Sequence, residues 1–118
     1  KIKEKKLMDN EKMEMVVFDI VNSAGTAKGL AYEALDEAFK GNFEKAEKLL
    51  KKADKALLAA HNVQTEIIQD EVEGRGIAPT VLFVHSQDHL MTAIEAKTLI
   101  EEMIKMCKRI NVLEKKIK

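Results

Sequence analysis

Residues 13–38 read MEMVVFDIVNSAGTAKGLAYEALDEA, and this stretch decides the fold. Its apolar side chains recur in steps of three and four, which is the period of one helix face. We therefore expect a long first helix from about Asp9 to Lys40, with Asp9 or Asn10 capping its start. The apolar stripe consists of Met13, Val16, Val17, Ile20, Ala24, Ala27, Leu30, Ala31, Ala34, Leu35 and Ala38.

A second helix is predicted over about residues 43–73. Gly41 suits the end of the first helix because glycine readily adopts the left-handed conformation. Asn42 is then the expected cap of the second helix, since asparagine is favoured at that position. The second stripe consists of Phe43, Ala46, Leu49, Leu50, Ala53, Ala56, Leu57, Ala60, Val63 and Ile67.

A third helix is predicted over about residues 79–115. The run Gly74-Arg75-Gly76 breaks the second pattern, and Pro79 suits a first helical turn, where its missing N–H costs nothing. The later part of this helix also has apolar residues in steps of three and four, as in a bundle or a coiled coil. These residues are Ala96, Leu99, Ile100, Met103, Cys107, Ile110, Leu113 and Ile117.

Short connections between three helices of similar length predict one all-α domain, an antiparallel three-helix bundle with up-down-up topology. At about 1.5 Å per residue, each helix is about 45 Å long, which is elongated for a chain of 118 residues. Three thin helices leave lateral apolar surface uncovered. We therefore expect the chain to self-associate.

The composition excludes several classes of protein. The 20 basic and 20 acidic residues balance, which argues against binding of nucleic acid or of an anionic membrane. The single cysteine, Cys107, excludes a disulfide framework and a four-cysteine zinc site, and it fits a reducing compartment. Apolar runs such as residues 81–84 are far shorter than the roughly 20 residues of a membrane span. No secretory signal is recognisable, so we expect a soluble, cytoplasmic protein whose native N-terminus lies upstream of Lys1.

One short segment carries chemistry, His85-Ser86-Gln87-Asp88-His89. On a helix, His85 and His89 lie one turn apart, and Asp88 lies close to the same broad face. This pattern has four interpretations: a zinc site, a nucleophilic histidine that carries a phosphoryl group, a His–Asp pair for acid–base catalysis, or a solvated polar face. The zinc interpretation lacks the glutamate that follows the first histidine of a zincin helix. A third ligand on another helix is not obvious, although His61 could in principle serve.

Asp88 lies in an apolar stripe with Val81, Val84 and Met91. A carboxylate in such a stripe is costly to bury unless it is paired, protonated or bound to a metal. If the stripe faces a symmetry axis, several copies of Asp88 meet there, and close carboxylates share protons or collect a cation. One interpretation is thus a trimer with an axial divalent metal, and the other is that Asp88 points to water.

Other chemically notable residues have structural interpretations. His61 is interpreted as a packing or capping histidine rather than a ligand. Cys107 lies on the third stripe and is interpreted as a small buried apolar residue. Met103 and Met106 are expected in the core.

Four sequence elements together resemble the IIA component of the lactose/cellobiose class of the bacterial phosphoenolpyruvate-dependent sugar phosphotransferase system. The most specific is residues 84–92, VHSQDHLMT, which is similar to the family's His-x-Gln-Asp-His-Leu-Met-Thr motif. The others are Ala60-His61 with Gln64-Thr65, residues 20–25 with Ala27, and Gly41-Asn42-Phe43 with Ala46, where the family usually has Gly-Asp-Phe. The resemblance covers roughly residues 13–110.

The resemblance implies a three-helix protomer in a nine-helix homotrimer. It implies that the phosphocarrier protein HPr phosphorylates His85 at Nε2. His85 would then pass the group to a cysteine of the IIB component. The system takes up a disaccharide such as lactose, cellobiose or chitobiose through the membrane IIC permease. Gln87 and His89 would lie around the phosphoryl group, across a subunit boundary. Asp88 would bind a divalent ion, typically Mg²⁺, shared by the three subunits.

Two rival functions are distinct from a phosphohistidine carrier. One is a non-catalytic helical oligomerisation module whose His/Asp cluster binds a metal for assembly. The other is a metal-dependent hydrolase, which would act without a partner. The sequence alone does not distinguish the sugars of the class, because a IIA component meets other proteins rather than the sugar.

Overall fold

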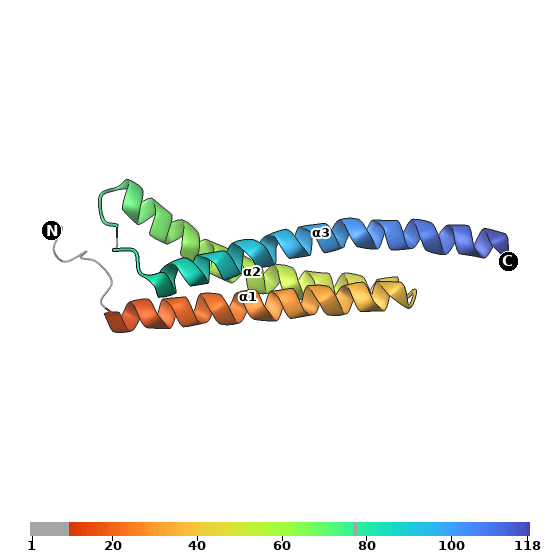
Figure 1. The fold of residues 1–118 in the computed structure, drawn as a ribbon, viewed down its shortest axis with the longest axis horizontal. Helices are drawn as coiled ribbons and strands as arrows, with labels where there is room; N and C mark the ends of the chain where they lie inside the picture. Colours follow the sequence, from red (N-terminus) through yellow and green to blue (C-terminus); the bar gives the residue numbers. More distant parts are fainter. Residues whose placement is uncertain (1–9, 77) are drawn as a thin grey trace.

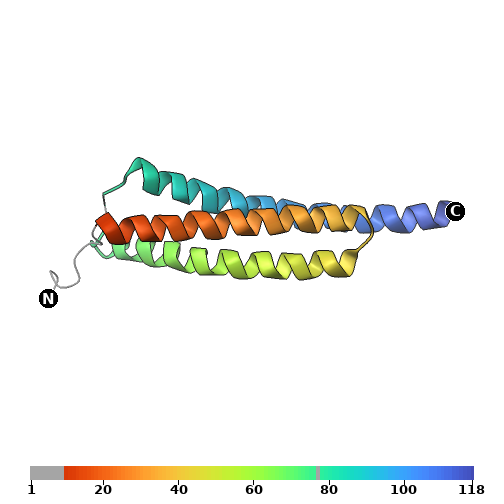
Figure 2. The same ribbon diagram turned by 90° about the horizontal axis from the view of Figure 1, so that it is seen from below.

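A computed structural model describes residues 10–76 and 78–118 and contains three helices within those ranges. They are α1 (Asn10–Phe39), α2 (Phe43–Val72) and α3 (Val81–Ile117). The predicted all-α up-down-up bundle is confirmed: successive helices run in opposite directions, and the molecule measures 70 × 22 × 21 Å (Figures 1 and 2). The candidate cap Asp9 lies outside the described residues. None of the described helices has the length and apolar character needed to cross a membrane.

The core forms along α1, which packs against both other helices, whereas α2 and α3 touch each other much less. Small alanine side chains bring the helices close together, since interaxial distance depends on the side chains at the contact. One buried cluster lies toward the start of α3: Ile20, Ala24, Ala27, Ala53, Leu57, Ala60, Leu90 and Ala93. The second lies toward the α1–α2 turn: Ala31, Ala34, Ala38, Ala46, Leu49, Ile100 and Ile104. All predicted stripe residues of α1 and α2 are buried or half-buried.

The α1–α2 turn is built as predicted in its backbone but not in its side chains. Gly41 has a φ of 84°, the left-handed conformation that ends the helix. Asn42 occupies the cap position of α2, but its side chain makes no capping hydrogen bond. Its Nδ2 instead donates to Glu37 Oε1 at 2.9 Å. The predicted capping role of the Asn42 side chain is therefore wrong, because the nearly buried Glu37 carboxylate offers a charged acceptor.

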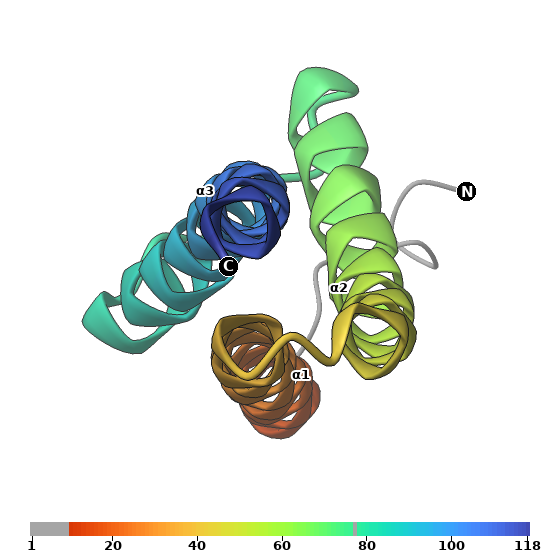
Figure 3. The ribbon, with the colours of Figure 1, turned by 90° about the vertical axis from the view of Figure 1, so that its right-hand side faces the viewer.

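The start of α3 is set by Thr80 rather than by Pro79. The Thr80 side chain accepts a hydrogen bond from the Phe83 amide at 3.0 Å, as an N-cap residue does. Pro79 precedes this cap and lies outside the first turn, which corrects the predicted helix start. From this cap, α3 diverges from the end of α2, as Figures 1 and 3 show.

The other end of α3 runs past the α1–α2 turn (Figures 1 and 2). The apolar residues of this part of α3 therefore divide between two faces. Ile100 and Ile104 are buried, and Cys107 is half-buried against the second cluster, which confirms its packing role only in part. The other face is exposed and consists of Leu99, Met103, Met106, Ile110, Leu113 and Ile117. The two methionines are thus not core residues of the described structure, because neither α1 nor α2 covers that face.

Candidate functional site

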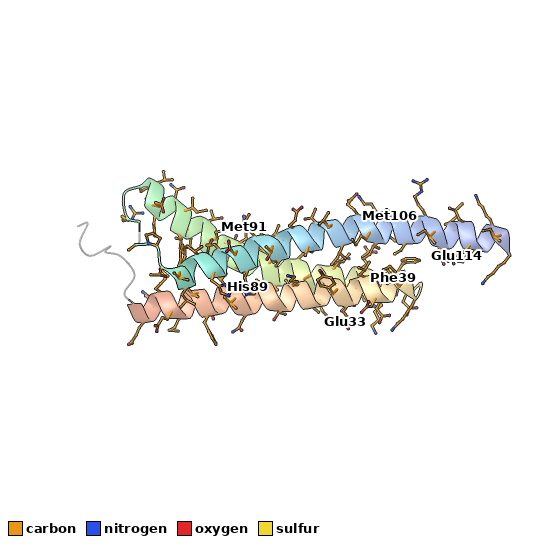
Figure 4. All side chains as sticks on the ribbon, viewed as in Figure 1. Glu33, Phe39, His89, Met91, Met106 and Glu114 are labelled. Carbon is orange, nitrogen blue, oxygen red and sulfur yellow. The ribbon has the colours of Figure 1, made fainter. Side chains whose placement is uncertain are left out.

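The histidine segment occupies the first turns of α3, at the end of the bundle where α2 and α3 diverge. His85 is exposed and His89 is half-buried. Their rings lie edge to face with centroids 4.6 Å apart and planes at 86°, a favourable arrangement for aromatic rings. The predicted contact between His85 and His89 is thus found within one chain. Figure 4 labels His89 on α3.

Gln87 belongs to a chain of hydrogen bonds that links α2 to α3. Gln64 on α2 donates from Nε2 to Gln87 Oε1 at 2.6 Å. Gln87 Nε2 in turn donates to Ser86 Oγ at 3.3 Å, and Ser86 Oγ donates to the Phe83 carbonyl at 2.6 Å. Ser86 is completely buried and Gln64 is 8% exposed. Burial of these polar groups is stable because each has a partner.

Gln87 consequently points toward α2, not toward the His85 ring of its own chain. Residues two apart on a helix do not face each other, and both amide atoms of Gln87 already have partners within the chain. Of the sequence-predicted phosphoryl neighbours, the single chain places His89 beside His85 and leaves Gln87 on a different side of α3.

Asp88 lies on the exposed side of α3. Val81, Val84 and Met91 of its stripe are each about half exposed or more. Within the described residues, no hydrogen bond or ion pair is formed by the Asp88 carboxylate; only its carbonyl accepts a bond, from Thr92 Oγ1 at 2.8 Å. A carboxylate can bind a hard divalent ion such as Mg²⁺, but a single carboxylate does not make a metal site.

The described residues contain no group of three or more His, Cys, Asp or Glu side chains that could hold a metal ion. His61 does not join His85 and His89, so the zinc site with His61 as third ligand is wrong for the single chain. His61 is exposed on α2 and lines a surface hollow with Leu57, Leu58, Ile94 and Thr98, so it is not a core residue.

A second polar link joins α2 to α3 farther from the histidines. The Lys97 ammonium pairs with Asp54 on α2 and with Glu101 at 2.9 Å. Burial opposes the charge of Lys97, but its hydrogen bonds to Asp54 and Glu101 outweigh that effect and raise its pKa above the usual value. These ion pairs hold the middle of α3 against α2, whereas the hydrogen bond between Gln64 and Gln87 holds its first turns.

Neither Gln64 nor the Ser86 hydroxyl was assigned a role from the sequence. A signal was available for Gln64, because it lies one turn after Ala60 and beside Val63 and Ile67 on the apolar side of α2. A polar residue at such a position needs a partner. The sequence alone does not identify that partner, since it belongs to another helix.

Three comparisons with known proteins bear on this site. Residues 15–108 match the family described as "PTS system, Lactose/Cellobiose specific IIA subunit". The lichenan-specific phosphotransferase enzyme IIA component of Bacillus subtilis is 41% identical over 101 residues, which are 86% of this chain and 92% of that relative. Other relatives at 35–42% identity are named for galactose, cellobiose and lactose.

Solved structures agree with this similarity. The cellobiose-specific enzyme IIA of Bacillus anthracis superimposes with a TM-score of 0.82 at 37% identity, covering 89% of this chain and 94% of that one. The chitobiose IIA component of Escherichia coli, solved in complex with HPr, gives a TM-score of 0.72 at 34% identity, covering 84% and 96%.

Proposed function

Because this chain belongs to the lactose/cellobiose-specific IIA family of the sugar phosphotransferase system, we propose that His85 is the residue on which it carries the phosphoryl group. Components of this family are phosphoryl carriers that take the group from HPr, and a relative of the same fold is known in complex with HPr. The observation that supports His85 is its exposed ring at the open end of the bundle, held edge to face by His89. An exposed imidazole is accessible to another protein, as a carrier requires.

The transfer needs no chemistry beyond two substitutions at phosphorus. The Nε2 lone pair of His85 attacks the phosphorus carried by the HPr histidine, and the electron pair of the broken P–N bond remains on HPr. In the second transfer, a cysteine thiolate of IIB attacks the same phosphorus, and the electron pair of that P–N bond returns to His85. Catalysis of such steps is mainly positioning and charge stabilisation.

The neighbours of His85 have separate parts in this proposal. His89, beside His85 in the same chain, restricts the His85 ring and donates to the phosphoryl oxygens. Gln87 points toward α2, so its amide donates to the phosphoryl group across a subunit boundary. The active unit is then the oligomer rather than the single chain.

The exposed face of α3 supports assembly as a homotrimer of nine helices. Its apolar residues from Leu99 to Ile117 are spaced in steps of four and three, the period of a coiled-coil seam. Asp88 lies about three turns before Leu99 on the same line of the helix. Three copies joined along this face bring their Asp88 carboxylates to the axis, where Mg²⁺ binds and offsets their repulsion.

The partners are HPr, a cognate IIB component and two further copies of this chain. We place the protein in the cytoplasm, which fits its single cysteine. The cargo is the phosphoryl group for uptake of a sugar of the lactose/cellobiose/chitobiose class. Relatives at 35–42% identity are named for four different sugars, so the neighbouring IIC permease is the better guide to the sugar itself.

The test is formation of a phosphohistidine. Wild-type protein incubated with phosphoenolpyruvate, the first enzyme of the system and HPr is expected to gain an acid-labile, alkali-stable phosphoryl adduct, and His85→Gln is expected to gain none. His61→Gln is the matched control, since His61 is an exposed histidine on α2, and it is expected to behave like wild type. Absence of the adduct in wild type, or its presence in His85→Gln, would overturn the assignment.

The non-catalytic oligomerisation module is not favoured, because the relatives are phosphotransferase components. The hydrolase alternative requires turnover by the isolated protein. Incubation of the protein alone with phosphorylated substrates, without HPr, is expected to release no phosphate.

A further inference from the structure

We propose that Gln64, on α2, is a positioning residue for phosphoryl transfer, because it fixes which end of the Gln87 side-chain amide acts as hydrogen-bond donor. This inference rests on the proposed function, in which Gln87 donates to the phosphoryl group. The amide of glutamine can be turned over, exchanging its oxygen and nitrogen. Only the surrounding hydrogen bonds decide between the two orientations.

The hydrogen bonds around Gln87 select one orientation. Gln64 Nε2 can only donate, and it lies 2.6 Å from Gln87 Oε1. On the other side, the Ser86 hydroxyl donates to the Phe83 carbonyl at 2.6 Å and therefore accepts from Gln87 Nε2. Both neighbours thus hold the nitrogen of Gln87 as the donor, and one of its two N–H bonds remains for another acceptor.

Gln64 is well placed to hold this orientation. It is 8% exposed, and its Nε2 also lies 3.6 Å from Met91 Sδ. Gln64 therefore has defined partners and little freedom to rotate. Its hydrogen bond to Gln87 joins α2 to α3, so it also ties the first turns of α3 to the rest of the chain.

The orientation matters because a phosphoryl group offers only acceptors. An N–H aimed at its oxygens stabilises the charge that spreads over them during transfer, whereas a carbonyl oxygen aimed at them repels that charge. Without Gln64, only the longer hydrogen bond of 3.3 Å to Ser86 Oγ would hold this orientation, and Gln87 would present its nitrogen for less of the time. Gln64 touches neither phosphorus nor His85, and its effect is exerted through Gln87.

A polarity reversal tests this inference. In Gln64→Glu, the carboxylate can only accept, so Gln87 is expected to turn its nitrogen toward residue 64 and its oxygen toward Ser86. Gln64→Met removes the donor while keeping length and volume. Gln69→Met is the matched control, because Gln69 lies on the same helix but is exposed and bonds Glu73 at 2.9 Å.

We expect the maximal rate of transfer from phospho-HPr to His85, measured by rapid quench at saturating donor, to fall about tenfold in Gln64→Met and further in Gln64→Glu. The HPr concentration at half-maximal rate is expected to stay unchanged, and Gln69→Met is expected to match wild type. Rates equal to wild type in both Gln64 variants, or a change confined to HPr affinity, would overturn the inference.

Two measurements keep the outcomes distinct. Side-chain amide NMR of the unphosphorylated protein reports Gln87 directly, and its two proton shifts are expected to change in Gln64→Glu and not in Gln69→Met; unchanged shifts would also overturn the inference. Failure of the proposed function appears differently, as absence of the adduct in wild type. Circular dichroism identifies a Gln64 variant that has lost its fold, in which case the NMR result of the other variant decides.

Discussion

The two ends of α3 are supported in opposite ways. At its start, Thr80 caps the helix and Gln64 ties Gln87 to α2. At its end, the helix runs beyond α1 and α2, and apolar residues such as Ile110 and Ile117 are exposed. The start is held by hydrogen bonds of its own chain, whereas the end presents a surface that α1 and α2 leave uncovered.

This contrast matches the two tasks that we propose for α3. Transfer requires groups held in a fixed orientation, and the start of α3 meets this need while leaving His85 exposed. The proposed assembly requires a continuous apolar seam, and the exposed apolar residues at the end of α3 have the matching spacing. Asp88 lies on the side of α3 where the two tasks meet, near the histidines and in line with the seam.

The largest effect is expected from charges placed in the exposed seam. Ile110→Asp combined with Leu113→Asp is expected to convert the proposed trimer into single chains of 13.3 kDa, because uncompensated carboxylates would be buried at the axis. Light scattering during gel filtration measures the mass. Lys115→Asp with Lys116→Asp, a matched pair of charge changes in the same turns, is expected to keep the trimer. If the wild-type protein has the mass of a single chain, the proposal that this apolar face forms a trimer interface is wrong.

The fold was largely predictable because it depends on local patterns. The apolar period of α1 identified its buried face, and Gly41 marked the turn because few other residues adopt a positive φ. The two faces at the end of α3 were not separated by the sequence. That division depends on how far α1 and α2 extend beside α3, and the period of α3 alone does not contain this information.

The contact between the two histidines was predictable, but the hydrogen bonds that link their neighbours to α2 were not. His85 and His89 one turn apart were read directly from helical spacing. The pairing of Gln64 with Gln87 joins two helices, and the register between them results from the packing of the whole bundle. Asn42 is a similar case. Its position favours a capping hydrogen bond to α2, but its side chain donates to Glu37 instead.

At the point where the two tasks meet, Asp88→Leu is expected to abolish axial metal binding while keeping or strengthening the trimer. Three close carboxylates are replaced by apolar contacts, which removes both the ligands and their repulsion. Metal content after gel filtration and calorimetric titration with MgCl₂ measure the first effect, and thermal melting measures the second. Glu95→Leu is the control, since Glu95 is an exposed carboxylate farther along α3. If the Asp88→Leu variant still binds the metal, Asp88 is not the axial metal ligand.

At the start of α3, His89→Gln is expected to slow transfer to His85 about tenfold without abolishing the adduct. The substitution removes the ring that lies 4.6 Å from the His85 ring and leaves the acceptor nitrogen in place. Single-turnover rates with phospho-HPr measure the effect, with His61→Gln as control. A complete loss of the adduct would mean that His89, not only His85, is required as acceptor, and an unchanged rate would exclude any role for His89.

The smallest effect on stability is expected at the α1–α2 turn, beyond which α3 no longer packs against α1 and α2. The hydrogen bond from Asn42 lowers the pKa of Glu37 below its usual value; partial burial acts the other way, and Lys45 and Lys40 lower it further. Because the folded-state pKa is the lower one, the contribution of Glu37 to the free energy of unfolding is complete above the unfolded pKa of about 4.3. It is lost as the pH falls through the folded value.

The difference in unfolding free energy between wild type and Glu37→Gln should therefore be nearly constant above about pH 5 and shrink as the pH falls below about 4.3, as measured by urea denaturation at each pH. Asn42→Ala should reduce this pH dependence, because it removes the largest cause of the shift. Glu33→Gln, an exposed site on the same helix, serves as the control and should give a nearly constant difference. If the Glu37→Gln difference is equally constant, the turn owes its stability to Gly41 and to packing rather than to the Glu37 carboxylate. The Glu37 charge would then not stabilise the α1–α2 turn, beyond which the exposed end of α3 begins.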